Sequence, residues 1–242
     1  MPKITFPTSD QDRLVLLQKI GATAAQDQSK GLNYLSEETL QKVNTQLPGL
    51  QTAYSALAAK FSHRSQEAAE RDGALSQLEV YVRDAWDGIK RRVRRNKEPA
   101  QVLALYKLPL SGDIPKITNR EAWVEMAKSI ILGDAEAVNQ GYPAMTSPTS
   151  TEIQAMVDNA LLESNQAVAA DREYDTAQAA MEPLRTSVGE LFKDVYAELQ
   201  FNLRKLDAPS QRRIIKTYGF RYYYQPGEPA EPEITETTPE AE

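Results

Sequence analysis

The sequence contains no cysteine and only one histidine, His63. Disulfides, thiolate metal sites and cysteine nucleophiles are therefore excluded, and a di-metal site built from two Glu-x-x-His motifs would need a second histidine. His63 stands between Ser62 and Arg64, and the sequence gives it no positioned partner for acid–base catalysis. Both glycine-rich phosphate-binding patterns, Gly-x-x-x-x-Gly-Lys-Ser/Thr and Gly-x-Gly-x-x-Gly, are absent. We expect no enzyme activity, no cofactor and no metal.

Glycine is scarce, with 11 residues in 242, whereas alanine, leucine, glutamate, glutamine and arginine are abundant, which favours helices. Long hydrophobic runs are missing too: the stretch Leu14–Leu17 is far shorter than the ~20 residues that a membrane span needs. Residues 1–13 lack the basic start and apolar run of a secretory signal. We therefore expect a cytoplasmic protein, with export by a leaderless route left open. The net charge of -6 disfavours a general nucleic-acid binder.

The clearest feature that is present is an internal repeat. Five positions in the first half are matched 110 residues later, namely Asp84, Trp86, Ile89, Val93 and Pro99 by Asp194, Tyr196, Leu199, Leu203 and Pro209. A short tag, Pro-Lys/Glu-Ile-Thr, also occurs three times, at residues 2–5, 115–118 and 232–235. A repeat of this length predicts two structural units of similar fold.

The predicted architecture is all-α, with two tandem antiparallel helical bundles. Each bundle would contain three long helices and one short helix. The first bundle is expected over residues 1–108 and the second over 118–220, joined by a linker at 109–117. Residues 221–242 would form an aromatic segment and an extended, acidic, proline-rich tail, because they offer too few apolar side chains to build a core.

Apolar residues and helix signals support the helices of the first repeat. Thr8, Ser9 and Asp10 offer an N-cap for the first helix and Ser36 one for the second, and Gly31 and Asn33 should end the first helix. A heptad-like seam predicts the second helix, with members Leu40, Val43, Leu47, Leu50, Tyr54, Leu57 and Phe61. Pro48 should kink or split this helix, and Asp72-Gly73 should separate it from the third. Pro183 falls opposite Gly73 in the second repeat, which predicts the same break there.

This layout resembles uncharacterised bacterial proteins built from tandem helical-bundle units. The shared features are a long heptad helix, a proline-bounded third helix, a short fourth helix ending in Tyr218-Gly219-Phe220, and a Pro/Thr-rich tail. The resemblance covers most of the chain and implies helical bundles. It implies no activity, so no functional residue is carried over from it.

A basic run is the strongest local charge feature, with cations Lys90, Arg91, Arg92, Arg94, Arg95 and Lys97. It could bind phosphate or an acidic partner, or it could be a solvated helix end whose cations complement the helix dipole. The corresponding stretch of the second repeat, Gln200–Leu206, contains only Arg204 and Lys205 as cations. The fold therefore does not require the basic run.

The tail and the aromatic segment are the other candidate contact regions. Residues 226–242 contain six glutamates and no basic residue, so they could meet the basic run of the same or a neighbouring molecule. The third tag, with Ile234, could dock on a neighbouring chain, or it could be a remnant of duplication. The segment Tyr222, Tyr223 and Tyr224 could be a contact surface, could pair as a strand, or could pack against the end of the second bundle.

These features predict a non-enzymatic structural or assembly protein that self-associates head to tail as a homo-oligomer or filament. The alternative is an adaptor that binds a polyanionic or acidic partner through residues 90–97. The expected partner is the protein itself or another protein, rather than nucleic acid or a membrane that the chain spans.

Overall fold

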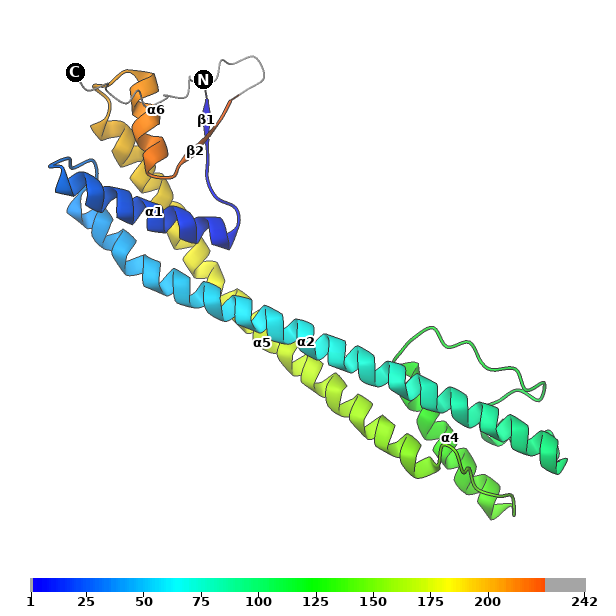
Figure 1. Ribbon diagram of the computed structural model, residues 1–242. Coiled ribbons are helices and arrows are strands. Elements are labelled where there is room, and N and C mark those ends of the chain that lie inside the picture. The colour runs from blue at the N-terminus through cyan, green and yellow to red at the C-terminus, as the bar shows by residue number, and fades with distance from the viewer. Residues whose placement is uncertain (1, 225–242) are drawn as a thin grey trace, which may run out of the picture. The chain divides into compact units, whose positions relative to one another are not determined.

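The computed structural model describes residues 2–224, which are mostly helical (Figure 1). The prediction of an all-α fold class is confirmed at this level. The elements in chain order are β1 (Lys3–Thr5), α1 (Asp10–Ser29), α2 (Glu37–Asn96), α3 (Val102–Leu105), α4 (Ala122–Asn139), α5 (Ser150–Asn202), α6 (Ala208–Thr217) and β2 (Arg221–Tyr223).

Side-chain caps set the helix starts. The Ser9 hydroxyl accepts a hydrogen bond from the Asp12 amide at 3.1 Å, and the Ser36 hydroxyl accepts from the Thr39 amide at 3.3 Å. Both caps were predicted from the sequence. Helix α5 starts with a reciprocal capping box that was not predicted: Thr149 Oγ1 accepts from the Glu152 amide at 3.2 Å, and the Glu152 carboxylate accepts from the Thr149 amide at 2.7 Å.

The breaks predicted at Asp72-Gly73 and Pro183 are wrong, and of the two alternatives at Pro48 the split does not occur. Helix α2 is 60 residues long and includes Pro48 and Gly73, and α5 is 53 residues long and includes Pro183. A proline inside a helix costs about 3 kcal/mol and a glycine about 1 kcal/mol. Burial of apolar side chains along the same helix can offset costs of this size. Buried residues lie close on both sides of each proline, as Val43 and Leu50 do around Pro48, and Ala74 and Leu75 directly follow Gly73. Each repeat therefore has one long helix where two were expected.

The helices form two compact units. The first joins the described residues of Met1–Ala58 and Thr176–Glu242, and the second is Ala59–Asp175. Each compact unit thus combines segments of both repeats, and neither coincides with the bundles expected at residues 1–108 and 118–220. The reason is that α2 and α5 each supply one end to one unit and the other end to the other.

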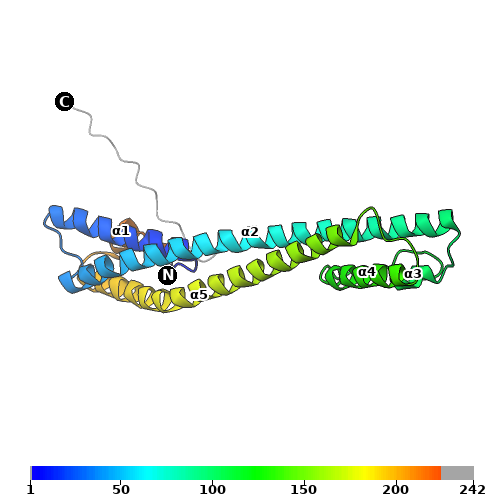
Figure 2. The same cartoon turned by 90° about the horizontal axis from the view of Figure 1, so that it is seen from below.

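The first compact unit packs α1 and α6 against the start of α2 and the end of α5 (Figures 1 and 2). Its core is aliphatic and aromatic, with Leu17, Ile20, Leu50, Met181, Val195, Leu199 and Tyr218 among its most buried residues. The strands β1 and β2 pair antiparallel, with Ile4 opposite Tyr222. Of the alternatives for the aromatic segment, the strand is therefore the one formed, and its partner is the first copy of the tag.

The second compact unit packs α3 and α4 against the end of α2 and the start of α5 (Figure 2). The matched position Trp86 is fully buried and donates a hydrogen bond to the Tyr106 carbonyl at 2.9 Å. Its ring centroid lies 6.0 Å from that of Trp123. The linker at 109–117 contains no helix or strand, and it is anchored by Ile114 and Ile117, which pack against this core.

Candidate binding site at the basic end of α2

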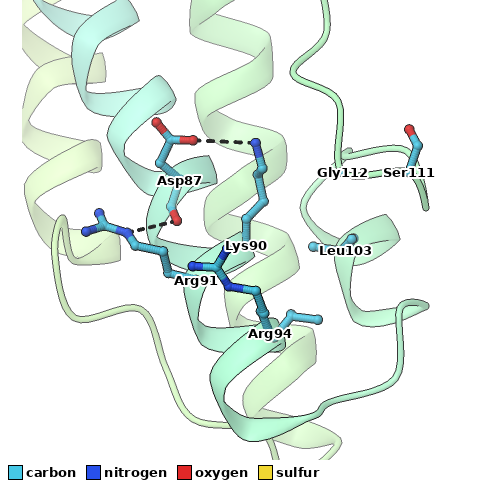
Figure 3. A pocket seen from close by; sticks show the side chains of 8 residues that line it. Asp87, Lys90, Arg91, Arg94, Leu103, Ser111 and Gly112 are labelled. Carbon is cyan, nitrogen blue, oxygen red and sulfur yellow. Dashed lines mark hydrogen bonds and ion pairs between the residues drawn. The ribbon is translucent and has the colours of Figure 1, made fainter.

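Residues 90–97, termed the basic end of α2, lie between two cavities of the second compact unit. The first, termed the α3 cavity, has a volume of about 650 Å³. Its lining residues come from α2, α3 and the linker, and include Lys90, Arg91, Arg94, Val93 and Leu103 (Figure 3). Three cations therefore surround a cavity that also offers apolar surface.

Contacts with Asp87 occupy two of these cations only partly. Lys90 Nζ lies 3.6 Å from Asp87 Oδ1, and Arg91 Nε donates to the Asp87 carbonyl at 3.2 Å (Figure 3). Arg94 is exposed and has no hydrogen-bond or ion-pair partner among residues 2–224. An ammonium and two guanidinium groups with spare donors can bind carboxylate or phosphate groups.

The second, termed the loop cavity, has a volume of about 430 Å³. It is lined by Arg91, Arg92 and Arg95 of α2 and by the loop at residues 143–148. Arg91 lines both cavities. The two cavities therefore share one cation, and the others line one cavity each.

The six predicted cations have different roles. Arg92 is held in the structure: it pairs with Glu98 at 3.3 Å, donates to the Pro143 carbonyl, and lies 5.5 Å from the centre of the Tyr106 ring. Its side chain is only 13% exposed. Arg95 and Lys97 are exposed and, within the described part of the chain, have no ion-pair or hydrogen-bond partner. The cations available for binding are thus Lys90, Arg91, Arg94, Arg95 and Lys97.

A buried polar network centred on Asp134 of α4 holds residues beside this site. Asp134 is only 5% exposed and accepts hydrogen bonds from the Tyr106 hydroxyl at 2.9 Å, the Met145 amide at 2.9 Å and the Ser150 hydroxyl at 2.6 Å. Burial raises the pKa of Tyr106 to about 12, so its hydroxyl remains a donor. The network fixes the start of the 143–148 loop and thereby one wall of the loop cavity.

The first compact unit contains a matched cavity of opposite charge. Asn202, 110 residues after Arg92, donates to the Tyr34 carbonyl at 2.9 Å, as Arg92 does to Pro143. The adjoining cavity, of about 310 Å³, is lined by Glu37 and Glu198 rather than arginines. An uncharged amide therefore makes the same loop contact as Arg92, and this contact does not require a cation.

The three predicted aromatic contact residues differ in how far their rings are exposed. Tyr222 is half-buried opposite Ile4, whereas Tyr223 is 57% exposed. The Tyr224 hydroxyl accepts a hydrogen bond from Lys216 Nζ at 3.2 Å. Only Tyr223 thus presents a largely free ring. Ile234, the remaining predicted contact residue, lies outside the described residues.

Sequence reasoning missed a carboxylate cluster between α2 and α5. Glu67, Glu70 and Glu163 each place an oxygen within 4.8 Å of the others, and one oxygen each of Glu67 and Glu163 is buried without a hydrogen-bond partner. His63 Nδ1 lies 3.4 Å from Glu67 Oε1. Carboxylate oxygens are ligands for hard cations. The only sequence signal was the helical spacing of His63, Glu67 and Glu70, since Glu163 is distant in sequence.

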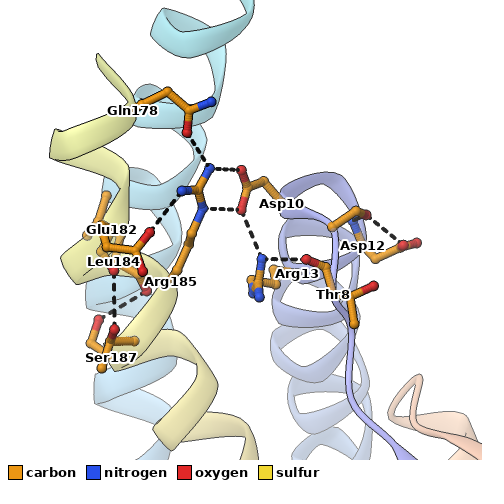
Figure 4. A network of polar contacts seen from close by, with 11 residues as sticks. Thr8, Asp10, Asp12, Arg13, Gln178, Glu182, Leu184, Arg185 and Ser187 are labelled. Atoms are coloured by element: carbon orange, nitrogen blue, oxygen red, sulfur yellow. Dashed lines mark hydrogen bonds and ion pairs between the residues drawn. The ribbon is translucent and has the colours of Figure 1, made fainter. Parts of the chain in front are cut away.

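A dense polar network in the first compact unit has a structural role (Figure 4). Arg185 on α5 forms two hydrogen bonds with the Asp10 carboxylate, at 2.9 and 2.7 Å, and contacts Gln178 and Glu182 on its own helix. The Arg185 guanidinium lowers the pKa of Asp10 below its ordinary value. Arg13 also binds Asp10, at 3.0 Å. With its donors engaged, the network joins α1 to α5 and leaves little capacity for a ligand.

No known protein family, curated protein or solved structure matches the chain. The resemblance to bacterial helical-bundle proteins therefore stays a prediction. Among residues 2–224, none of the helices combines the length and apolar character that crossing a bilayer requires.

Proposed function

We propose that the protein is a non-enzymatic assembly protein that binds an acidic polypeptide through the basic end of α2. The observation that carries this proposal is the contrast between two matched cavities. One is lined by Arg91, Arg92 and Arg95, and the other by Glu37 and Glu198. Arg92 and Glu198 are each held by contacts of the fold, so the charges that are free to differ are Arg91 and Arg95 in one cavity and Glu37 in the other.

The mixed charged and apolar lining of the α3 cavity favours a polypeptide over a nucleic acid. Val93 and Leu103 line the cavity together with the cations. A ligand that carries both carboxylates and an aliphatic side chain could therefore contact the charged and the apolar parts of the cavity. No step of catalysis is assigned to the site.

The binding test uses a fluorescently labelled oligoglutamate peptide and the full chain. We expect saturable binding that weakens as salt rises, because the contacts are exposed charges. The double variant Arg94→Gln/Arg95→Gln should bind about fivefold to tenfold more weakly, since each exposed ion pair contributes about 0.2–1 kcal/mol.

The matched control is Arg204→Gln/Lys205→Gln, which removes the same charge 110 residues later in the second repeat. It should bind the peptide like the unaltered protein. Absence of binding, or an equal loss in both double variants, would overturn the proposal, because the effect would then follow net charge alone. Stronger binding to a labelled single-stranded DNA than to oligoglutamate would overturn the choice of a polypeptide.

A further inference from the structure

Resting on the proposed function, we infer that the acidic polypeptide is residues 225–242 of a second copy of this chain, with Ile234 entering the α3 cavity. In this arrangement one molecule supplies the α3 cavity and the next supplies the segment that follows β2. The protein would then assemble with copies of itself.

Charge complementarity is the first support. Residues 225–242 include Glu228, Glu231, Glu233, Glu236, Glu240 and Glu242 and no lysine or arginine. The α3 cavity is lined by Lys90, Arg91 and Arg94, against the single carboxylate of Asp87. Glu233 and Glu236 flank the tag isoleucine, so an ion pair is available on either side of it.

The apolar part of the cavity selects Ile234 within that segment. It is the one large aliphatic side chain of residues 225–242. Val93 and Leu103 line the cavity, whose volume of about 650 Å³ exceeds that of one side chain. Burial of an isoleucine against such residues adds affinity that charge alone does not supply.

The other copies of the tag show how its isoleucine behaves. Ile117, in the second copy, packs against the core of the second compact unit. Ile4, in the first copy, is half-buried and pairs with Tyr222 in the sheet. Both described copies thus bury their isoleucine at least partly. Where those copies have Lys3 or Lys116, the third has Glu233, which suits a basic cavity.

The cavity lies in the second compact unit, and the segment follows β2, which lies in the first. Pairing between two molecules makes no demand on how the two units of one chain are placed. It also predicts concentration dependence, which pairing within one chain would not show.

The experiment measures binding of a labelled peptide of residues 225–242 to the chain lacking those residues. The peptide should bind at least about tenfold more tightly than oligoglutamate of equal charge, and its Ile234→Ser form should lose most of this advantage. Lys90→Gln/Arg94→Gln in the protein should weaken binding, and Arg204→Gln/Lys205→Gln, which removes the same charge, should not. The peptide variant leaves the protein's folding untouched, and circular dichroism checks the protein variants.

Light scattering on the full chain completes the test. The mass should rise with concentration and return to that of the monomer when residues 225–242 are deleted. Peptide binding with a monomeric full chain at every concentration would overturn the second-copy arrangement. Binding of oligoglutamate as tight as that of the peptide would overturn the inference while leaving the proposed function standing, and binding of neither would overturn both.

Discussion

At the residue scale, Asp134 is the polar group on which the site depends. It is the one charged residue among the buried side chains of the described chain, and it accepts three hydrogen bonds. A buried carboxylate is tolerated only when such donors compensate its lost hydration. Asp134→Ala would leave the Met145 amide and the Tyr106 hydroxyl without their acceptor.

We predict that Asp134→Ala lowers the free energy of unfolding by about 2–4 kcal/mol. Ser150→Ala, which removes one donor near the surface of the same network, should cost only about 1 kcal/mol. Both tryptophans of the chain, Trp86 and Trp123, lie in the second compact unit, so urea unfolding followed by tryptophan fluorescence reports on it. Equal losses for the two variants would show that the network is not organised around Asp134.

The ion pair between Asp10 and Arg185 belongs to the same scale and has a pH signature. The guanidinium lowers the pKa of Asp10, so folding favours the ionised carboxylate. This stabilisation is fully present above the ordinary pKa, 3.8, and is lost as the pH falls through the lowered folded-state value. Asp10→Asn should therefore destabilise the protein by about 1–2 kcal/mol at neutral pH and by much less near pH 2. Urea unfolding followed by circular dichroism at both values measures this, and a penalty independent of pH would contradict it.

At the scale of the element, local sequence signals predicted helix termini, such as the end of α1 before Gly31, better than the continuity of the two long helices. Ser9 and Ser36 cap helices as expected, because a cap acts through contacts within three residues. The breaks expected at Gly73 and Pro183 are absent, because the cost of each is local whereas the packing that offsets it comes from distant segments. The cations of the site could likewise be read from the sequence, but the cavities beside them could not, since these depend on α3, the linker and the 143–148 loop.

Two helical glycines test this balance. A Cβ on Gly73 would meet nothing within 4 Å, whereas a Cβ on Gly133 would lie 2.0 Å from the Leu105 carbonyl oxygen. Gly73→Ala should stabilise the protein by about 0.5–1 kcal/mol through helix propensity. Gly133→Ala should destabilise it by at least about 3 kcal/mol, because α3 and α4 must separate. Thermal unfolding followed by tryptophan fluorescence compares them, and destabilisation by Gly73→Ala would indicate that the helix is interrupted there after all.

At the scale of the whole molecule, each compact unit contains segments from both halves of the chain. In the first compact unit, Tyr218 beside α6 donates to Asp27 on α1 at 2.7 Å; in the second, Tyr106 beside α3 donates to Asp134 on α4 at 2.9 Å. Each bond joins the end of one repeat to the first helix of the other. The residues after these tyrosines, Gly219 and Lys107, both have positive φ. The two compact units therefore share this tyrosine–aspartate hydrogen bond and the positive-φ residue after it, and each unit contains segments from both halves of the chain.

This arrangement predicts that neither repeat folds alone. Fragments 1–113 and 114–242, expressed separately, should show reduced helix content by circular dichroism, because each lacks the partner segments of both compact units. When mixed, they should regain helix and elute as a one-to-one complex, since the missing contacts, such as Asp10 with Arg185 and Arg120 with Asp72, lie between the fragments. Independent, fully helical monomers from either fragment would restore the bundles expected at residues 1–108 and 118–220. Recovery only on mixing would show that each half of the chain needs the other to complete both compact units.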